Sequence, residues 1–575
     1  MTAPAYRLGG QFVTREVFYA AACDPQRSVV VEACAGAGKT WMLVSRIVRA
    51  LLCGAQPHEI LAITFTRKAA AEMRERLNAW LTDLALPGTS DAALVQALCQ
   101  RGLDDVAAQA AAPALRGLYE RVLQTGRPVE IHTFHAWFSQ LLRAAPLELL
   151  AELGLRSEMT LIEDLDEHAG AVYRLFYAAV SRDTKLRADY EALVAQRGRD
   201  ATRRWLDAAW GKRVEFELAD AAQVLEHSVA PASHLWPELA ELDHPAQMLQ
   251  STSLRQRLHA LALALGLGGA RAQDAATGLV TALAHNEDPG HAPAFFQTAW
   301  EALFTQKATP RKQLGKVHDL VAIQSELEQV AQRVRQHEAH VEHMRMVRLT
   351  RVLLAEYAAY KRQRGLADMA DLERCALALL RDSTLSGWVQ ERLDSRVRHL
   401  LIDEFQDTSP LQWHALRSWL AGYAGAGGGA QRSPSVFIVG DPKQSIYRFR
   451  RAEPRVFDAA SEFVQQALGG SVLACDHTRR NSPGVLAAVN AAFESAHAAG
   501  EFDGFRAHTT EVADGPMPAL CALPGVERPA REVNNAPAGW RDSLTTPRVG
   551  AQTVLREQEA LKVALAVREL VAEKQ

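Results

Sequence analysis

Two short segments of this 575-residue chain carry side chains that can do chemistry on a phosphate group. The first combines two glycines, a lysine and a threonine. Glycines let a loop turn tightly and point its backbone N–H groups at phosphate oxygens, and the lysine adds a positive charge. The threonine hydroxyl can bind a divalent metal ion. The residues of this phosphate loop are Ala33, Cys34, Ala35, Gly36, Ala37, Gly38, Lys39 and Thr40.

The second segment places two carboxylates directly after an apolar run. Asp403 would hold a magnesium ion, together with the Thr40 hydroxyl, and Glu404 would act as the general base that polarises the attacking water. Acidic pairs are common at strand ends, so the pair alone is not specific. Gln406, Asp407 and Thr408 follow and make the pattern specific. Together the two segments predict binding and hydrolysis of a nucleoside triphosphate with Mg²⁺.

Strands must position both segments. Residues 28–32 are mainly β-branched and apolar, which predicts a buried parallel strand, and residues 41–52 predict the helix after the loop. Residues 397–402 predict a second buried strand, which places Asp403 at its carboxyl end, where open parallel sheets bind ligands. The alternation of strands and helices predicts an α/β fold with a parallel sheet.

Several segments resemble one known family in its own motif order. Residues 403–408 (DEFQDT) resemble motif II of the UvrD/Rep group of superfamily 1 helicases. The other matching segments are 64–73 (motif Ia), 131–135 (the Thr-Phe-His motif), 439–450 (motif III) and 480–483 (motif IV). The long stretch between the Thr-Phe-His motif and motif II is similar to the RecB/AddA branch, which handles double-strand breaks.

The resemblance implies a fold and a set of residue roles. It implies a RecA-like P-loop NTPase lobe with a large inserted helical subdomain and the start of a second RecA-like lobe. Gln444 would contact the γ-phosphate, and Arg480 would clamp it, with Arg479 as the rival because motif IV is irregular here. Bases of single-stranded DNA would stack on aromatic rings, which tolerates any sequence. The expected DNA-binding residues are Thr64, Phe65, Thr66, Thr133, Tyr447 and Phe449.

The resemblance also implies an activity. It is an ATP-dependent DNA helicase or translocase that moves 3′ to 5′ in DNA repair or recombination, with ATP and Mg²⁺ as cofactors. The implied partners are single-stranded or end-containing double-stranded DNA and a nuclease or second helicase subunit. The alternative is a truncated half-motor that binds nucleotide and DNA without unwinding, because motifs V and VI are absent. The glutamine with which the family reads adenine is absent as well.

Some of these residues have plainer interpretations. An aromatic residue after a strand, such as Phe65, usually belongs to the core. His132 and His135 can be ordinary packed residues, and we assign them no catalysis. His337, His340 and His343 lie three apart on a predicted helix. We favour a solvated helix over a metal site there, because no cysteine or carboxylate motif lies beside them.

The chain is expected to divide into six segments. Alanine- and leucine-rich stretches with helical periodicity interrupt the α/β pattern twice. The expected segments are the opening stretch of the first lobe (1–80), a helical insertion (81–130), the Thr-Phe-His motif of the first lobe (131–145), a helical accessory subdomain (146–360), the closing stretch of the first lobe (361–465), and an incomplete second lobe (466–575).

Composition is that of a globular protein. Hydrophobic residues make up 48% and charged residues 23%, and the net charge is −3, so DNA would bind in a local groove rather than to a basic surface. The seven cysteines form no Cys-x-x-Cys pair, which argues against disulfides and zinc. No apolar run is long enough to span a membrane, and we expect a cytoplasmic protein without a membrane partner.

Overall fold

The structure is a computed structural model that forms two compact units. Unit 1 comprises Met1–Ala144 and Glu373–Gln575, and unit 2 comprises Ala145–Leu372. Each unit is described by itself. The described residues are 5–145, 147–152, 159–162, 164–284, 289–311, 314–315, 317–381, 396–423, 433–447, 451–502, 504–513, 523–527 and 551–572.

Unit 1 is built on an eight-stranded sheet with the order β2-β1-β10-β3-β9-β8-β4-β5. The strands from β10 to β5 pair in parallel, and β1 and β2 are antiparallel additions at one edge. The bounds are β1 (Tyr6–Leu8), β2 (Gln11–Phe12), β3 (Val29–Ala33), β4 (Ile60–Thr64), β5 (Glu130–Thr133), β8 (His399–Ile402), β9 (Ser435–Gly440) and β10 (Ser471–Cys475).

The central strands are buried on both faces, as their near-continuous apolar sequences predict. Every residue of β4 and β8 is buried, and so is nearly every residue of β3 and β9. Because side chains alternate between the two faces of a strand, helices must cover both faces. Their buried side chains form the main core together with α2 and α3. The predicted α/β fold with a parallel sheet is confirmed.

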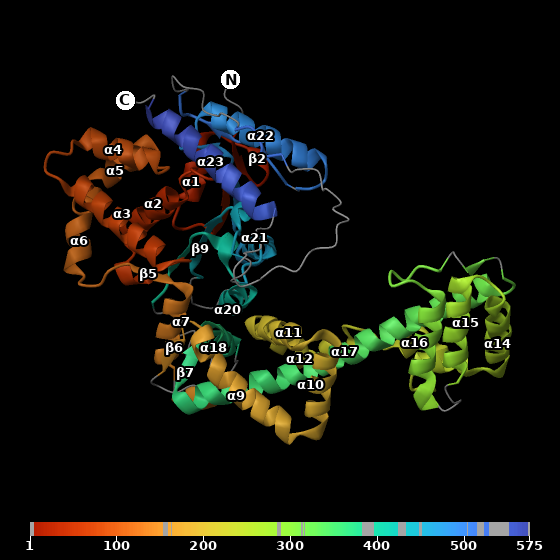
Figure 1. Ribbon diagram of the computed structural model, residues 1–575. Coiled ribbons are helices and arrows are strands. Elements are labelled where there is room, and N and C mark those ends of the chain that lie inside the picture. The colour runs from red at the N-terminus through yellow and green to blue at the C-terminus, as the bar shows by residue number, and fades with distance from the viewer. Residues whose placement is uncertain are drawn as a thin grey trace. The chain divides into compact units, whose positions relative to one another are not determined.

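The helices of unit 1 surround this sheet, and Figure 1 shows α2 and α3 near the side where α4, α5 and α6 gather. Two helices, α22 and α23, come from the C-terminal region. The helix bounds are α1 (Arg15–Ala22), α2 (Lys39–Leu52), α3 (Arg67–Ala85), α4 (Asp91–Gln100), α5 (Asp105–Arg116), α6 (Leu118–Gln124), α7 (Phe134–Arg143), α20 (Pro410–Ala421), α21 (Arg455–Leu468), α22 (Pro483–Ala498) and α23 (Ala551–Ala572).

Strand β10 corrects one expected boundary. We expected a second lobe from residue 466, but β10 pairs in parallel with β3, from Ser471 beside Val29 to Cys475 beside Ala33. The alternating burial of its apolar side chains lets it extend the first sheet beside the phosphate-loop strand. A separate two-stranded sheet follows, formed by β11 (His477–Thr478) and β12 (Thr509–Thr510).

Unit 2 is almost entirely helical and is organised along one helix, α17 (Leu320–Arg364). Its 45 residues correspond to a length of roughly 68 Å at ~1.5 Å per residue. The bundle α14–α16 lies near its start, and α9, α10 and α11 pack along its later turns (Figure 1). The other bounds are α8 (Leu147–Glu152), α9 (Asp166–Arg182), α10 (Thr184–Arg197), α11 (Arg199–Gly211), α12 (Arg213–Ala221), α13 (Ala232–Leu235), α14 (Thr252–Gly266), α15 (Ala270–Leu283), α16 (Ala292–Leu303), β6 (Thr160–Ile162) and β7 (Leu366–Asp368), and α18 (Met369–Arg381) crosses the boundary between the units.

A buried ionic network closes the end of α17. Lys361 Nζ lies 2.9 Å from Asp368 Oδ2 and 2.6 Å from Asp371 Oδ2, and Arg213 Nη2 lies 2.9 Å from Asp368 Oδ1. The Tyr357 hydroxyl donates to Asp368 Oδ2 as well. Buried charges are tolerated when each has a partner, so this network fixes α12, α17 and β7 to one another.

The three histidines of α17 contact other groups than a metal. His340 Nδ1 lies 2.7 Å from the Val229 carbonyl oxygen, and His343 Nε2 lies 2.6 Å from that of Leu225. The His337 ring packs against His244, with ring centroids 4.9 Å apart. Within the ranges that the structure describes, no cluster of three or more metal-binding side chains occurs. The helix therefore uses two of these histidines to hold the preceding segment.

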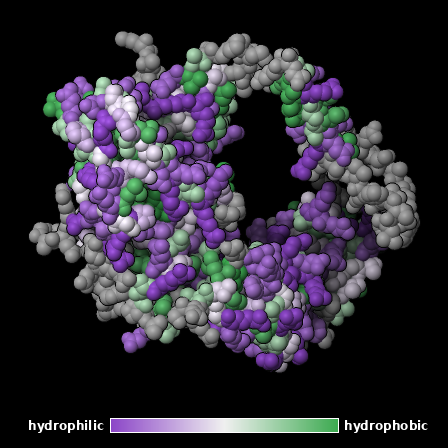
Figure 2. Space-filling view, turned by 90° about the vertical axis from the view of Figure 1, so that its left-hand side faces the viewer, coloured by the Kyte–Doolittle hydropathy of each residue, from purple (hydrophilic) through white to green (hydrophobic). Residues whose placement is uncertain are grey.

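The face of the molecule in Figure 2 is mainly hydrophilic, with hydrophobic residues scattered over it. Among helices of the described ranges, none combines the length and the apolar character needed to cross a membrane.

His399 is expected to make unit 1 sensitive to acid. Burial, helped by the charge of Arg46, lowers the pKa of His399 to about 4, and its Nδ1 lies 2.8 Å from Ser435 Oγ. An unfolded histidine has a pKa of about 6.5, so between these values only the unfolded chain binds a proton. Stability is complete above about pH 6.5 and falls as pH drops, by about 2 kcal/mol at pH 5.

Urea unfolding of His399→Asn and of the parent chain at pH 7.5 and pH 5 measures this. The variant should lose less stability between the two pH values than the parent. His497, which is exposed, supplies the control His497→Asn, which should behave like the parent. Equal losses in all three chains would contradict the expectation.

Candidate functional site

The phosphate loop connects β3 to α2. Gly38 is the N-cap of α2 with a left-handed backbone (φ 90°), and no side chain caps the helix. The free N–H groups of the first turn, with the positive end of the helix dipole, favour an anion there. Lys39 and Thr40 open the helix at this point, so the sequence-predicted cation and hydroxyl lie at the helix N-terminus.

The loop lysine contacts the acidic segment after β8. Lys39 Nζ lies 3.0 Å from Glu404 Oε2, and Gln406 Nε2 donates to the same oxygen at 2.8 Å. The Asp441 N–H donates to Gln406 Oε1 at 2.9 Å, and Gln444 Nε2 donates to Asp441 Oδ2 at 2.6 Å. A continuous series of contacts therefore joins Lys39 to Gln444 through Gln406.

The carboxylates beside Lys39 form a fitting donor set for a divalent cation. Burial raises the pKa of Asp403 to about 7, and the nearby charge of Glu404 adds to this. Burial and Glu404 likewise raise the pKa of Asp407 to about 6, and its Oδ1 is buried without a hydrogen-bond partner among the described residues. Crowded carboxylate oxygens of this kind are the hard ligands that Mg²⁺ prefers.

The two candidate arginines of motif IV differ in their contacts. Arg479 is engaged: its Nη2 donates to the Tyr19 hydroxyl at 3.2 Å, and its Nε lies 3.0 Å from Glu511 Oε1. Arg480 is exposed, and over the described ranges its guanidinium has no hydrogen-bond or ion-pair partner. The free guanidinium is available to an added phosphate, which favours Arg480 for the clamp.

Motif IV lies directly against the phosphate loop. The Arg479 N–H donates to the Gly36 carbonyl at 2.9 Å. A Cβ added to Gly36 would collide with the Thr478 hydroxyl and would lie 2.7 Å from the Arg480 Cβ, and the φ of 77° disfavours other residues. Glycine is therefore required here by close approach as well as by backbone conformation.

The predicted DNA-binding residues fall into two groups. The Phe65 and Tyr447 rings lie together, with centroids 4.8 Å apart and planes tilted by 34°. The hydroxyls of Thr66 and Thr133 accept from the Ala69 and Ala136 N–H groups and cap α3 and α7. Phe449 lies outside the described residues.

Thr64 does not reach DNA in this structure, which corrects that prediction. Its side chain is fully buried, and Oγ1 lacks a partner in the described ranges. The position ends β4, where the strand lies between β8 and β5. Because residues of a strand alternate between faces, the more accessible position is the next one, Phe65.

His132 and His135 both lie beside carboxylates. His132 Nε2 is 2.5 Å from Glu130 Oε2, and His135 Nε2 is 3.2 Å from Glu373 Oε1. Glu373 is buried and also accepts from Gln412 Nε2 at 2.6 Å. These contacts fit the plainer interpretation, in which both histidines are structural.

Four charged residues near the site were missed by sequence reasoning: Glu32, Lys443, Asp476 and Arg506. They form ion pairs beside the phosphate loop. A weak signal existed for Glu32 and Lys443, because each directly precedes a predicted site segment or residue. No pattern connects either residue with Arg506, which lies in a stretch without periodicity.

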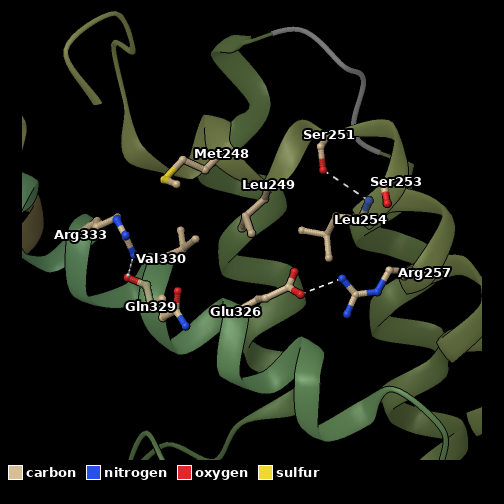
Figure 3. A pocket seen from close by; sticks show the side chains of 10 residues that line it. All are labelled: Met248, Leu249, Ser251, Ser253, Leu254, Arg257, Glu326, Gln329, Val330 and Arg333. Carbon is tan, nitrogen blue, oxygen red and sulfur yellow. Dashed lines mark hydrogen bonds and ion pairs between the residues drawn. The ribbon is translucent and has the colours of Figure 1, made fainter. Parts of the chain in front are cut away.

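A hollow in unit 2 holds charged residues that are already paired. It measures about 190 Å³ and lies between η4 (Pro245–Gln250), α14 and α17 (Figure 3). Arg257 Nη1 donates to Glu326 Oε1 at 2.7 Å, and Arg333 Nη2 donates to Glu238 Oε1 at 3.0 Å. Because these arginines are neutralised, the hollow does not offer a strong anion site.

Comparison with known proteins agrees with this geometry. The relatives are ATP-dependent helicase/nuclease subunits A: from Levilactobacillus brevis, 28% identical over 81% of this chain and 37% of the relative, from Bacillus cereus strain B4264, 26% over 81% and 38%, and from Desulfitobacterium hafniense, 26% over 82% and 35%. The chain thus spans less than two fifths of their length. The family described as UvrD/REP helicase N-terminal domain matches residues 14–465, and the chain belongs to this family.

Proposed function

We propose that this chain is the ATP-binding portion of a DNA helicase or translocase that moves 3′ to 5′ along single-stranded DNA in repair or recombination. The relatives are named as helicase/nuclease subunits, which supports DNA ends as the substrate. The word subunit supports a further chain as partner, either a nuclease or a second helicase.

The series of contacts from the phosphate loop to the aromatic pair carries this proposal. It runs from Lys39 through Glu404 and Gln406 to Asp441 and Gln444. Tyr447 lies three residues after Gln444, and its ring packs against that of Phe65. A change at the γ-phosphate would therefore move a ring on which a base can stack, as translocation needs.

The residues have distinct proposed roles in hydrolysis. Lys39 would leave Glu404 to bind the β- and γ-phosphates, which frees the carboxylate to accept a proton from the attacking water. Thr40 and Asp403 would hold Mg²⁺, which neutralises the developing phosphate charge when bound. Gln444 would sense the γ-phosphate, and Arg480 would stabilise the charge that develops on it.

Steady-state ATP hydrolysis with and without oligo-dT tests the proposal. The parent chain should turn over ATP faster with DNA, Lys39→Ala should lose turnover, and Tyr447→Ala should lose most of the stimulation. Lys68→Ala is the matched control, because Lys68 is exposed on α3 and should leave turnover unchanged.

Two results would change the proposal. Binding of nucleotide and DNA without turnover would identify the half-motor, and the polypeptide that completes it would be sought by adding candidate subunits. No binding of either ligand would reject the motor proposal altogether.

A further inference from the structure

A group of ion pairs lies beside the proposed catalytic residues and joins three segments of unit 1. Glu32, at the end of β3, is its centre. Lys443 Nζ lies 2.6 Å from Glu32 Oε1, and Arg506 Nη1 donates to Glu32 Oε2 at 3.0 Å. Arg506 Nε donates to Asp476 Oδ2 at 2.7 Å. We call these four residues the Glu32 cluster.

The Glu32 cluster is sheltered from solvent and balanced in charge. The exposed side-chain fractions are 22% for Glu32 and Arg506, 15% for Lys443 and 6% for Asp476. Charge-assisted hydrogen bonds are stronger in such surroundings than at an open surface. Burial alone would raise the pKa of Glu32, but its bond to Arg506 and the charge of Lys443 lower that pKa below its ordinary value.

Each segment held by the Glu32 cluster leads directly into a proposed functional segment. Glu32 precedes Ala33, where the phosphate loop begins. Lys443 precedes Gln444, and its Nζ also lies 3.4 Å from Asp441 Oδ1. Asp476 follows β10 and lies four positions before Arg480. The cluster therefore fixes the phosphate loop, motif III and motif IV to one carboxylate.

We propose that Glu32 is a positioning residue that couples the nucleotide site to the DNA site. The proposal rests on the proposed function and adds a residue that touches neither ligand. With Glu32 in place, a shift of the phosphate loop moves Lys443 and with it the loop that carries Gln444 and Tyr447. Without its charge, the two sites bind independently.

The coupling factor between the two ligands tests this proposal. It is the ratio of the dissociation constants of a fluorescent, non-hydrolysable ATP analogue without and with saturating oligo-dT, measured on the 575-residue chain. For the parent we expect a ratio or inverse ratio of about 5 to 150, the usual range of coupling. For Glu32→Gln we expect less than about twofold, with the affinity for the analogue alone changed less than about threefold.

Glu59→Gln is the matched control. Glu59 pairs with Arg398 at 3.1 Å, and its side chain is 20% exposed, so the same change is made at similar burial before β4 rather than beside the phosphate loop. This variant should keep the parent's coupling. Loss of coupling in Glu32→Gln but not in Glu59→Gln supports the proposal, and parental coupling in Glu32→Gln overturns it.

Arg506 supplies a second, independent variant. Arg506→Gln should lose coupling as Glu32→Gln does, and the double variant should lose no more than either single one, because both changes remove one interaction. Arg506→Lys keeps one charged contact and should retain some of the coupling. Circular dichroism identifies a variant that fails to fold, and the other residue's variant then decides the question.

The experiment also separates this proposal from the proposed function. A parent chain that binds both ligands without coupling overturns the role of Glu32 and leaves the two binding sites in place. A parent chain that binds neither ligand rejects the proposed function, and the role of Glu32 with it.

Discussion

Glu404→Gln is expected to lower DNA-stimulated ATP turnover by about 100- to 10,000-fold, the usual contribution of a general base. The amide keeps the size of the carboxylate but cannot accept the proton of the attacking water. Nucleotide affinity should not fall, because Lys39 must leave Glu404, 3.0 Å away, before it reaches a phosphate. Turnover and equilibrium binding of ATP measure the two effects separately.

Asp407→Asn is the comparison for this prediction. Asp407 lies in the same acidic segment and its pKa is also raised by burial, to about 6. It should affect turnover less than Glu404→Gln. If Asp407→Asn abolishes turnover and Glu404→Gln lowers it less than tenfold, the general base is Asp407.

Arg480→Ala is expected to lower turnover by about 1,000-fold or more, as the loss of a charge-stabilising arginine does in related NTPases. The free guanidinium of Arg480 would act on the charge that develops at the γ-phosphate, so kcat should fall much more than KM rises. Steady-state kinetics with ATP and saturating oligo-dT measure both constants.

Arg479→Ala is the matched control, since the two arginines are neighbours. Arg479 contacts Tyr19 and Glu511, so its removal should lower thermal stability or nucleotide affinity and change kcat less than tenfold. The reverse pattern, with kcat lost in Arg479→Ala alone, would assign the clamp to Arg479.

Local sequence patterns predicted those regions of the molecule that depend on near neighbours. The phosphate loop lies between β3 and α2 because a β-branched run, two glycines and a helix-forming stretch follow one another. Asp403 lies at a strand end for the same reason. Phe65 and Tyr447 were assigned to one function by resemblance, and their contact shows that the fold brings them together.

Long-range pairing is what the sequence did not predict. Strand β10 reads equally well as the start of a new sheet, and only its pairing with β3 assigns it to the first one. Thr64 has the right residue type for a phosphate contact, but its register in β4 buries it. Arg506 lies in an aperiodic stretch, and an ion pair to Glu32 depends on the whole chain path between them.

The pairing of β10 with β3 also determines how the proposed clamp arginine is supplied. Arg480 follows the end of β10, Cys475, by five residues, which can span at most about 17 Å when fully extended. The guanidinium is thus tethered to the sheet that carries the phosphate loop. A short tether gives a group a local concentration that a separate protein reaches only at high abundance. In the proposed mechanism this chain therefore carries its own arginine finger in cis and needs no second molecule to deliver one.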